Sequence, residues 1–255
     1  MEKYSNWRDK GTGIHPFIHK RTGLDWPIGL FFIKLPFIFL TACVYMASRQ
    51  IGWEWIPCRV LMFLFGFTNI KEKLKINPKS GDLIIANHSS YLDSFYLTAR
   101  LKATHFVLDS DNTVEFHGKK EPLKKVLKIF KRERKGPILV FPEGTTSNGL
   151  AILQFEQIIS DEILLSSKIH VLGLNYGRAD VRGSLCYGSV VSHFVKLCSR
   201  FGNKLNIAGT TYEHIFGDAN ENIANLCSKM SNLKRVGLAL KDKKEFLEYF
   251  DKKNK

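Results

Sequence analysis

The sequence contains few cysteines, and they follow no pattern. Cys43, Cys58, Cys186, Cys198 and Cys227 are odd in number, widely scattered, and include no CxxC pair. This argues against a disulfide framework or a zinc site, and it is typical of a protein in a reducing compartment.

The chain also lacks internal repeats, linkers rich in Gly, Ser or Pro, and a recognisable secretory signal, since it starts with the polar MEKYSNWRDKGTG. Acidic residues are scarce: 24 Asp and Glu against 38 Lys and Arg give a formal net charge of +14. Nucleic acid, an anionic bilayer surface or phosphorylated substrates would each suit this charge. No recognised nucleic-acid-binding motif accompanies it, so we expect no nucleic-acid partner.

Long apolar runs are present near the N-terminus, at 27–48 and 51–67. The first is about as long as a membrane-spanning helix requires, but Lys34 and Pro36 interrupt it and the second run is short. We therefore predict a membrane-associated helical hairpin, either kinked or dipping into one leaflet. A single span, or two buried helices of a soluble core, are the alternatives.

From about residue 72 the pattern becomes α/β, and 255 residues with 44% hydrophobic content suffice for one sizeable domain. Short apolar runs predict buried strands, most of them parallel, at 82–87, 105–109, 137–142, 169–176 and 204–212. Helical patterns lie near 92–102, 121–134, 151–160 and 188–200. The prediction is a mixed, mostly parallel sheet flanked by helices, with a basic helical segment over 216–255.

The segment EPLKKVLKIFKRERKG, residues 121–136, combines one apolar stripe with many lysines and arginines. The basic face is either a solvated outer surface or a surface that meets anionic lipid or a polyphosphate.

A first candidate site is NHSSYLD, residues 87–93, which follows a predicted buried strand. Open α/β sheets bind their ligands at the carboxyl ends of strands, where His88 would lie. Ser89 or Ser90 can cap the next helix, which would let Asp93 fold back to one ring nitrogen of His88. The other nitrogen could then act as a general base toward a substrate hydroxyl.

The second candidate is FPEGTTSNG, residues 141–149, after another predicted strand. Its small residues would let backbone N–H groups point at a phosphate or an oxyanion. An ordinary turn between a strand and a helix is the alternative.

Together, the two motifs resemble the first and third motifs of the PlsC-type glycerolipid acyltransferases, over roughly residues 70–215. The segment MEKYSNWRDKGTGIHPF further resembles the fungal lysophosphatidic acid:oleoyl-CoA branch, membrane proteins of the endoplasmic reticulum and lipid droplets. The resemblance implies a polar segment 1–26, membrane helices in 27–67, and a PlsC-like acyltransferase domain in 70–215.

The resemblance also implies roles for individual residues. His88 corresponds to the general base and Asp93 to the carboxylate that orients it. Glu143, Gly144 and Thr145, with Thr146 next to them, match the motif that contacts the acyl acceptor. The implied reaction transfers an acyl group from acyl-CoA, a co-substrate, to a lysophospholipid, most simply lysophosphatidic acid. It needs no metal and no other cofactor.

The sequence departs from the family where phosphate is bound. Thr146 stands where many members have arginine, HFVLDSDNTVEFHG lacks the arginine of an intermediate motif, and Val171 replaces a common proline. Other cations could supply the missing charge, namely Lys119, Lys120, Lys135, Arg178 or Arg182.

Two functions of different classes therefore remain. The first is a membrane acyltransferase of the endoplasmic reticulum or lipid droplet, with its catalytic face toward the cytosol. The second is a catalytically inactive protein that binds lipid or acyl-CoA and serves droplet organisation or trafficking. The presence of both His88 and Asp93 favours the enzyme, whereas the missing arginines favour the binding protein.

Overall fold

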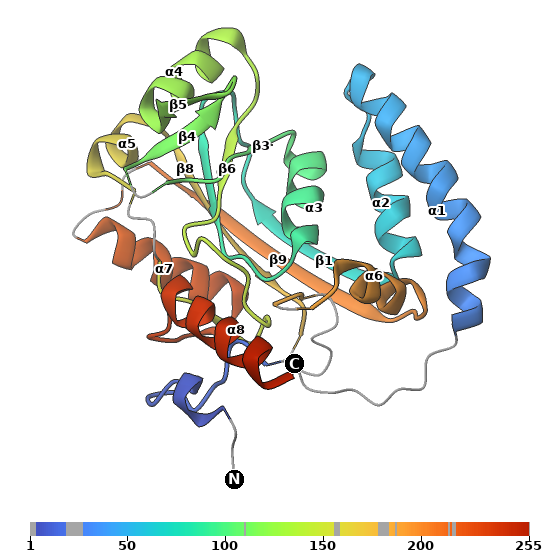
Figure 1. Ribbon diagram of the computed structural model, residues 1–255. Helices are drawn as coiled ribbons and strands as arrows, with labels where there is room; N and C mark the ends of the chain where they lie inside the picture. The colour runs from blue at the N-terminus through green and yellow to red at the C-terminus, as the bar shows by residue number, and fades with distance from the viewer. Residues whose placement is uncertain are drawn as a thin grey trace.

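A computed structural model describes residues 4–18, 28–109, 111–155, 159–177, 184–186, 188–213, 215 and 218–254. A six-stranded sheet lies at its centre, in the order β1-β9-β8-β2-β6-β3 (Figure 1). The strands are β1 (Phe67–Lys75), β2 (Leu83–Ala86), β3 (Thr104–His105), β6 (Ile138–Val140), β8 (Ile169–Asn175) and β9 (Asn203–Tyr212). All neighbouring pairs are parallel except β8 and β9, so the predicted mixed, mostly parallel sheet is confirmed.

Helices cover both faces of this sheet because alternate strand residues point to opposite sides. In β2, Ile84 and Ala86 face a core formed with α2 (Trp55–Leu64), α3 (Tyr91–Leu101) and α6 (Val190–Cys198). Leu83 and Ile85 face the other core, with α4 (Leu123–Glu133), α5 (Asp161–Ser166) and α7 (Ala219–Ser231). The central strands are therefore apolar throughout, as the short apolar runs predicted.

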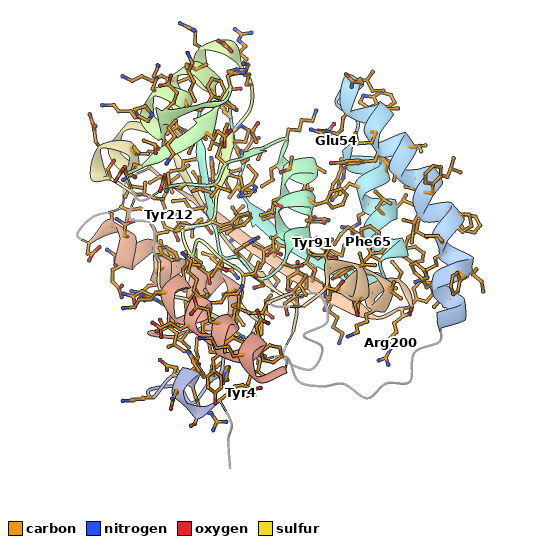
Figure 2. All side chains as sticks on the ribbon, viewed as in Figure 1. Tyr4, Glu54, Phe65, Tyr91, Arg200 and Tyr212 are labelled. Carbon is orange, nitrogen blue, oxygen red and sulfur yellow. The ribbon has the colours of Figure 1, made fainter. Side chains whose placement is uncertain are left out.

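A third, smaller core joins the two ends of the chain. It combines Phe17, the short strand β7 (Ala151–Ile152) and Phe246 of α8 (Leu240–Asn254). β7 pairs with β10 (Lys234–Arg235), which precedes α8. In Figure 1 the N-terminal turn η1 (Ser5–Trp7) lies beside α8, and the labelled Tyr4 in Figure 2 marks this contact. Tyr4 packs on Phe246 with ring centroids 5.8 Å apart.

The N-terminal apolar region contains one long helix, not a clear hairpin, which corrects that part of the prediction. The helix α1 (Ile28–Ser48) continues into η2 (Arg49–Ile51), and the segment Gly29–Ile51 is long and apolar enough to cross a membrane. Most of this segment is exposed, including Phe32, Phe39 and Leu40. α2 has only 10 residues, and its buried side chains pack on the sheet domain, so it is not an equal second arm.

Lys34, the charge that interrupts the first apolar run, points toward the protein. Lys34 is 4% exposed, donates to the Arg200 carbonyl at 3.1 Å, and lies over the Phe201 ring. Arg59 of α2 donates to the Tyr96 hydroxyl at 2.8 Å, and that hydroxyl donates to Glu72 of β1. These contacts hold both helices against the domain and give each cation a polar partner.

Several predicted elements differ from those observed. The edge strand β1 was not predicted, because FTNIKEKLK is rich in charge; beyond Phe67 its residues are exposed or half-buried. The helix predicted over 151–160 is wrong in its first residues, which form β7. The hairpin of β4 (Thr113–Phe116) and β5 (Lys119–Pro122) was also missed, and β5 occupies the start of the predicted helix 121–134.

Gly173 allows α7 to lie directly against β8, and it gives a test of this packing. A Cβ at Gly173 would lie 2.1 Å from the Ser231 nitrogen and 2.5 Å from the Met230 carbonyl carbon. We expect Gly173→Ala to lower the free energy of unfolding by about 1–3 kcal/mol through overpacking. Urea unfolding in detergent micelles measures this, with Gly11→Ala, which meets only the Asp9 carboxylate at 3.6 Å, as the control. Equal stability of the two variants would contradict this packing.

Candidate functional site

The candidate site lies where three neighbouring parallel strands end. β8, β2 and β6 are adjacent and parallel, so their carboxyl ends share one edge of the sheet. The Asn87 side chain donates to the Leu174 carbonyl at 3.1 Å and accepts from the Leu174 nitrogen at 2.7 Å. This continues the pairing of β2 with β8 by one residue and fixes the point at which His88 leaves the sheet.

The His88 side chain is mostly buried but remains partly accessible to solvent. It is 17% exposed, and its ring stacks on Phe141 with centroids 4.2 Å apart. The Nδ1 atom lies 3.4 Å from Asp93 Oδ2, within the range of an ion pair, but the two make no hydrogen bond. His105, at the end of β3, meets the edge of Phe141, and burial lowers the pKa of His105 to about 4. His105 is therefore neutral at pH 7.

Asp93 is fully buried at the start of α3. Its Oδ2 accepts from the Ser89 nitrogen at 2.7 Å and from the Ser90 nitrogen at 2.8 Å. The Ser90 hydroxyl in turn caps the helix, so Asp93 and Ser90 form a capping box. The helix cap, the Asp93 carboxylate and His88 therefore lie together, but the predicted hydrogen bond between Asp93 and a ring nitrogen of His88 is not formed.

Tyr176 is a site residue that the sequence reasoning missed. It follows β8 directly, is 1% exposed, and donates its hydroxyl to Asp93 Oδ1. Burial and the Asp93 carboxylate raise the pKa of Tyr176 well above its ordinary value, so the phenol keeps its proton. The position of Tyr176 at the end of the predicted strand 169–176 was the available signal, because strand ends at this edge come together.

Glu143 connects the two motifs. It is fully buried, its Oε1 accepts from the His88 nitrogen at 2.7 Å, and its Oε2 accepts from the Leu153 nitrogen at 2.8 Å. Burial raises the pKa of Glu143 to about 8, against the opposing effect of the two N–H groups. Its role in this structure is to hold the backbone of His88 in register with the segment after β6.

The turn Gly144–Thr146 lies at the surface beside these residues, and Gly144 has a positive φ of 66°. The next residues are tied down: the Ser147 nitrogen donates to the His88 carbonyl at 3.1 Å, and the Asn148 nitrogen to the Pro16 carbonyl at 2.7 Å. The N–H groups of Thr145 and Thr146 donate to no described residue. The turn can therefore offer two N–H donors to an anion.

The cations proposed from the sequence do not gather at this site. Lys120 pairs with Asp109 at 2.5 Å, Lys135 pairs with Glu133, and Lys119 lies on β5. Arg178 and Arg182 lie outside the described residues. Among the described residues, Lys243 of α8 is a cation that contacts the turn, and no sequence signal pointed to it.

Other lysines line a groove at the opposite edge of the sheet, beside Gly81 and Asp82, which precede β2. The groove has a volume of about 1120 Å³ and contains none of the predicted site residues. Its lysines are Lys75, Lys79, Lys124, Lys128, Lys131 and Lys168. Part of the basic face of α4 is thus the wall of a groove.

No group of three or more His, Cys, Asp or Glu side chains among the described residues could hold a metal ion.

Comparison with known proteins gives distant relatives of one kind. The chain is 26% identical over 204 residues to a Schizosaccharomyces pombe protein provisionally named a lysophosphatidic acid:oleoyl-CoA acyltransferase, covering 61% of this chain and 67% of that one. It is 26% identical over 193 residues to a Saccharomyces cerevisiae lysophosphatidic acid:oleoyl-CoA acyltransferase, covering 61% of each. An Arabidopsis thaliana lysophospholipid acyltransferase is 24% identical over 120 residues, covering 40% of this chain and 22% of that one.

No protein-family model matches the chain. The three relatives make it a distant homologue of fungal lysophosphatidic acid:oleoyl-CoA acyltransferases and of a plant lysophospholipid acyltransferase.

The raised pKa of Glu143 predicts a pH-dependent stability. Because the folded-state pKa of about 8 exceeds the ordinary 4.5, the folded chain holds this proton more tightly than the unfolded chain. Stability from Glu143 is then present below pH 4.5 and is lost as pH rises toward 8.

Relative to Glu143→Gln, we expect the wild type to lose stability over this range, by at most about 1.4 kcal/mol per pH unit. Urea unfolding in micelles from pH 4 to 9 measures the difference. Glu245→Gln, on the exposed side of α8, is the surface control. A difference between wild type and Glu143→Gln that stays constant with pH would contradict the assignment.

Proposed function

We propose that this protein is an acyl-CoA-dependent lysophospholipid O-acyltransferase that converts lysophosphatidic acid to phosphatidic acid. Two neighbouring features support this most directly. The Nδ1 atom of His88 faces the buried Asp93 carboxylate, and Glu143 joins the backbone of His88 to a turn that can offer N–H donors to an anion. Distant homology to proteins named for this reaction supports the same proposal.

In the proposed reaction, the free hydroxyl of the lysophospholipid attacks the thioester carbonyl carbon of acyl-CoA. His88 takes the hydroxyl proton on Nε2 while its Nδ1–H faces Asp93. The new ester C–O bond forms, the C–S bond breaks, and the thiolate of CoA leaves and receives the proton back from His88. General-base catalysis of this kind typically contributes ~10²–10⁴ in rate.

The geometry of His88 and Asp93 suits a general base whose hydrogen bond to the carboxylate forms when substrate binds. The distance of 3.4 Å between His88 Nδ1 and Asp93 Oδ2 is longer than a hydrogen bond. Hydrogen bonds of catalytic pairs are often long without substrate and shorten in the complex. Asp93 itself is held from three sides, by the Ser89 and Ser90 N–H groups and the Tyr176 hydroxyl, so the ring of His88 is the part that would adjust.

We further propose that the protein works at a membrane, because its acceptor is a lipid and α1 presents an exposed apolar surface. The endoplasmic reticulum membrane or the lipid-droplet surface, with the site toward the cytosol, is the location we propose. Fractionation of cells that express the tagged chain, with droplet and microsomal markers, tests it.

A second candidate is a lipid- or acyl-CoA-binding protein without catalytic activity. The observation that favours it is that both oxygens of Asp93 already have partners in the capping box and Tyr176, so Asp93 has a structural task without His88. The two candidates predict different results for acyl transfer.

For the proposed function, membranes that contain the protein receive labelled oleoyl-CoA with lysophosphatidic acid, lysophosphatidylcholine or lysophosphatidylethanolamine. We expect transfer to lysophosphatidic acid to be fastest, and His88→Ala to lower it by about 10²-fold or more because the base is lost. His117→Ala, outside the described site, is the matched control. If the wild-type protein binds these lipids but transfers no acyl group, the result would contradict the enzymatic proposal and support the binding protein.

Tyr176→Phe tests whether catalysis depends on the orientation of the Asp93 carboxylate. Loss of the hydroxyl removes one of the hydrogen bonds that position the carboxylate, so we expect kcat to fall several-fold to about tenfold, consistent with a hydrogen bond to a charged group. The KM for oleoyl-CoA should change little. An unaltered kcat in a folded Tyr176→Phe protein would show that Asp93 does not need this contact.

A further inference from the structure

A buried ammonium group contacts the turn Gly144–Thr146. Lys243 of α8 is 5% exposed, and its Nζ donates to Thr145 Oγ1 at 2.9 Å, to the Thr146 carbonyl at 2.7 Å and to Thr146 Oγ1 at 3.0 Å. These three acceptors match the three donors of an ammonium group. The buried amine therefore fixes the shape of the turn.

The helix that carries Lys243 is held firmly in place. Phe246, one turn later, is fully buried among the N-terminal aromatic residues, including Tyr4 and Phe17. At the start of α8, the Ala239 nitrogen donates to the Asp242 carboxylate at 2.7 Å. In Figure 2 the labelled Tyr4 lies beside this helix. A buried lysine on so well anchored a helix has a fixed position at the turn.

The charge of Lys243 has no counter-charge in the described part of the chain. No described carboxylate forms an ion pair with it. Burial lowers the pKa of Lys243, and the titratable groups that oppose this effect are Cys186, which hydrogen-bonds the amine, and Glu143. Burial raises the pKa of Cys186 to about 11 and that of Glu143 to about 8, so both are mainly neutral at pH 7. A buried, uncompensated cation is costly unless an anion comes near it.

The turn has exposed surface and N–H groups that could bind such an anion. Gly144 is exposed, Thr145 and Thr146 are half-buried, and the N–H groups of both threonines lack a described acceptor. An anion held by these N–H groups would lie close to the ammonium, which hydrogen-bonds the same two residues. Oriented N–H groups with a nearby cation are the usual elements of a phosphate site.

We propose that Lys243 is a positioning residue that shapes the Gly144–Thr146 turn into a receptor for the phosphate of the acyl acceptor, whose charge Lys243 offsets. This rests on the proposed function, and it names the group that selects the acceptor. The cation that the motif lacks at Thr146 is thus supplied from 97 residues further along the chain.

Lys243→Met tests the proposal, because it keeps the length of the side chain and removes its charge and its donors. We expect the KM for lysophosphatidic acid to rise about tenfold or more, consistent with the loss of charge-assisted hydrogen bonding. The KM for oleoyl-CoA and the kcat should stay within about twofold, which separates the acceptor phosphate from the phosphates of CoA. Lys244→Met, on the exposed side of the same helix, is the matched control.

Two further variants separate this role from a purely structural one. Lys243→Arg keeps the charge, so it should restore the KM for lysophosphatidic acid to within a few-fold of the wild type. Thr145→Val removes one acceptor of the ammonium without touching α8, and it should raise the same KM by a smaller factor. It is the decisive variant if Lys243→Met does not fold.

Lysophosphatidic acid binding in the His88→Ala background keeps this proposal distinct from the proposed function. Isothermal titration in micelles then compares His88→Ala with His88→Ala/Lys243→Met. If the wild type transfers no acyl group, the proposed function fails, but tenfold weaker binding in the double variant still upholds the role of Lys243. Equal binding by the two proteins would overturn it, as would a Lys243→Met enzyme with an unchanged KM for lysophosphatidic acid or an equal rise in both KM values.

Discussion

The buried Glu143 carboxyl group is the connection on which the arrangement of the site depends. Its two oxygens accept from the backbone nitrogens of His88 and Leu153, so one side chain joins the end of β2 to the segment that follows β6. Burying this group costs free energy, as its pKa of about 8 indicates. The chain therefore maintains an unfavourable group in order to fix two backbone segments, and the direction of the His88 side chain follows from that register.

The same edge of the sheet draws in segments from both ends of the chain. Asn148 donates its side-chain amide to the His15 and Ile18 carbonyls at 2.8 and 2.7 Å, while Lys243 holds the preceding turn from α8. Phe17 and Phe246 then pack in one small core behind the motif. The residues that shape the candidate site therefore extend beyond the range 70–215 over which the sequence resembles the acyltransferases.

The proximity of His88, Asp93 and Glu143 could be predicted from the sequence. Buried parallel strands end at a common edge of the sheet, and a serine before a helix lets a carboxylate at the third helical position fold back. The sequence was not sufficient for β1, whose charged residues do not look like a buried strand, nor for β7, which is only two residues long. Lys243 could not be found at all. In a lysine-rich tail, the sequence does not distinguish Lys243 from the other lysines, although aromatic packing anchors its helix.

The net charge of +14 shows why composition is a poor guide to the site. Much of the positive charge lies on the surface, where α4 contributes lysines to a groove at the edge of the sheet remote from His88, and water and salt screen such charges strongly. The buried ammonium of Lys243, which has no described counter-charge, is screened far less, so it would act more strongly on an anion at the neighbouring turn. If the proposed phosphate site is correct, recognition of an acidic headgroup depends less on how many cations the chain carries than on the burial of Lys243 beside the turn. The proposal would then account for a phosphate-binding motif that has threonine at position 146.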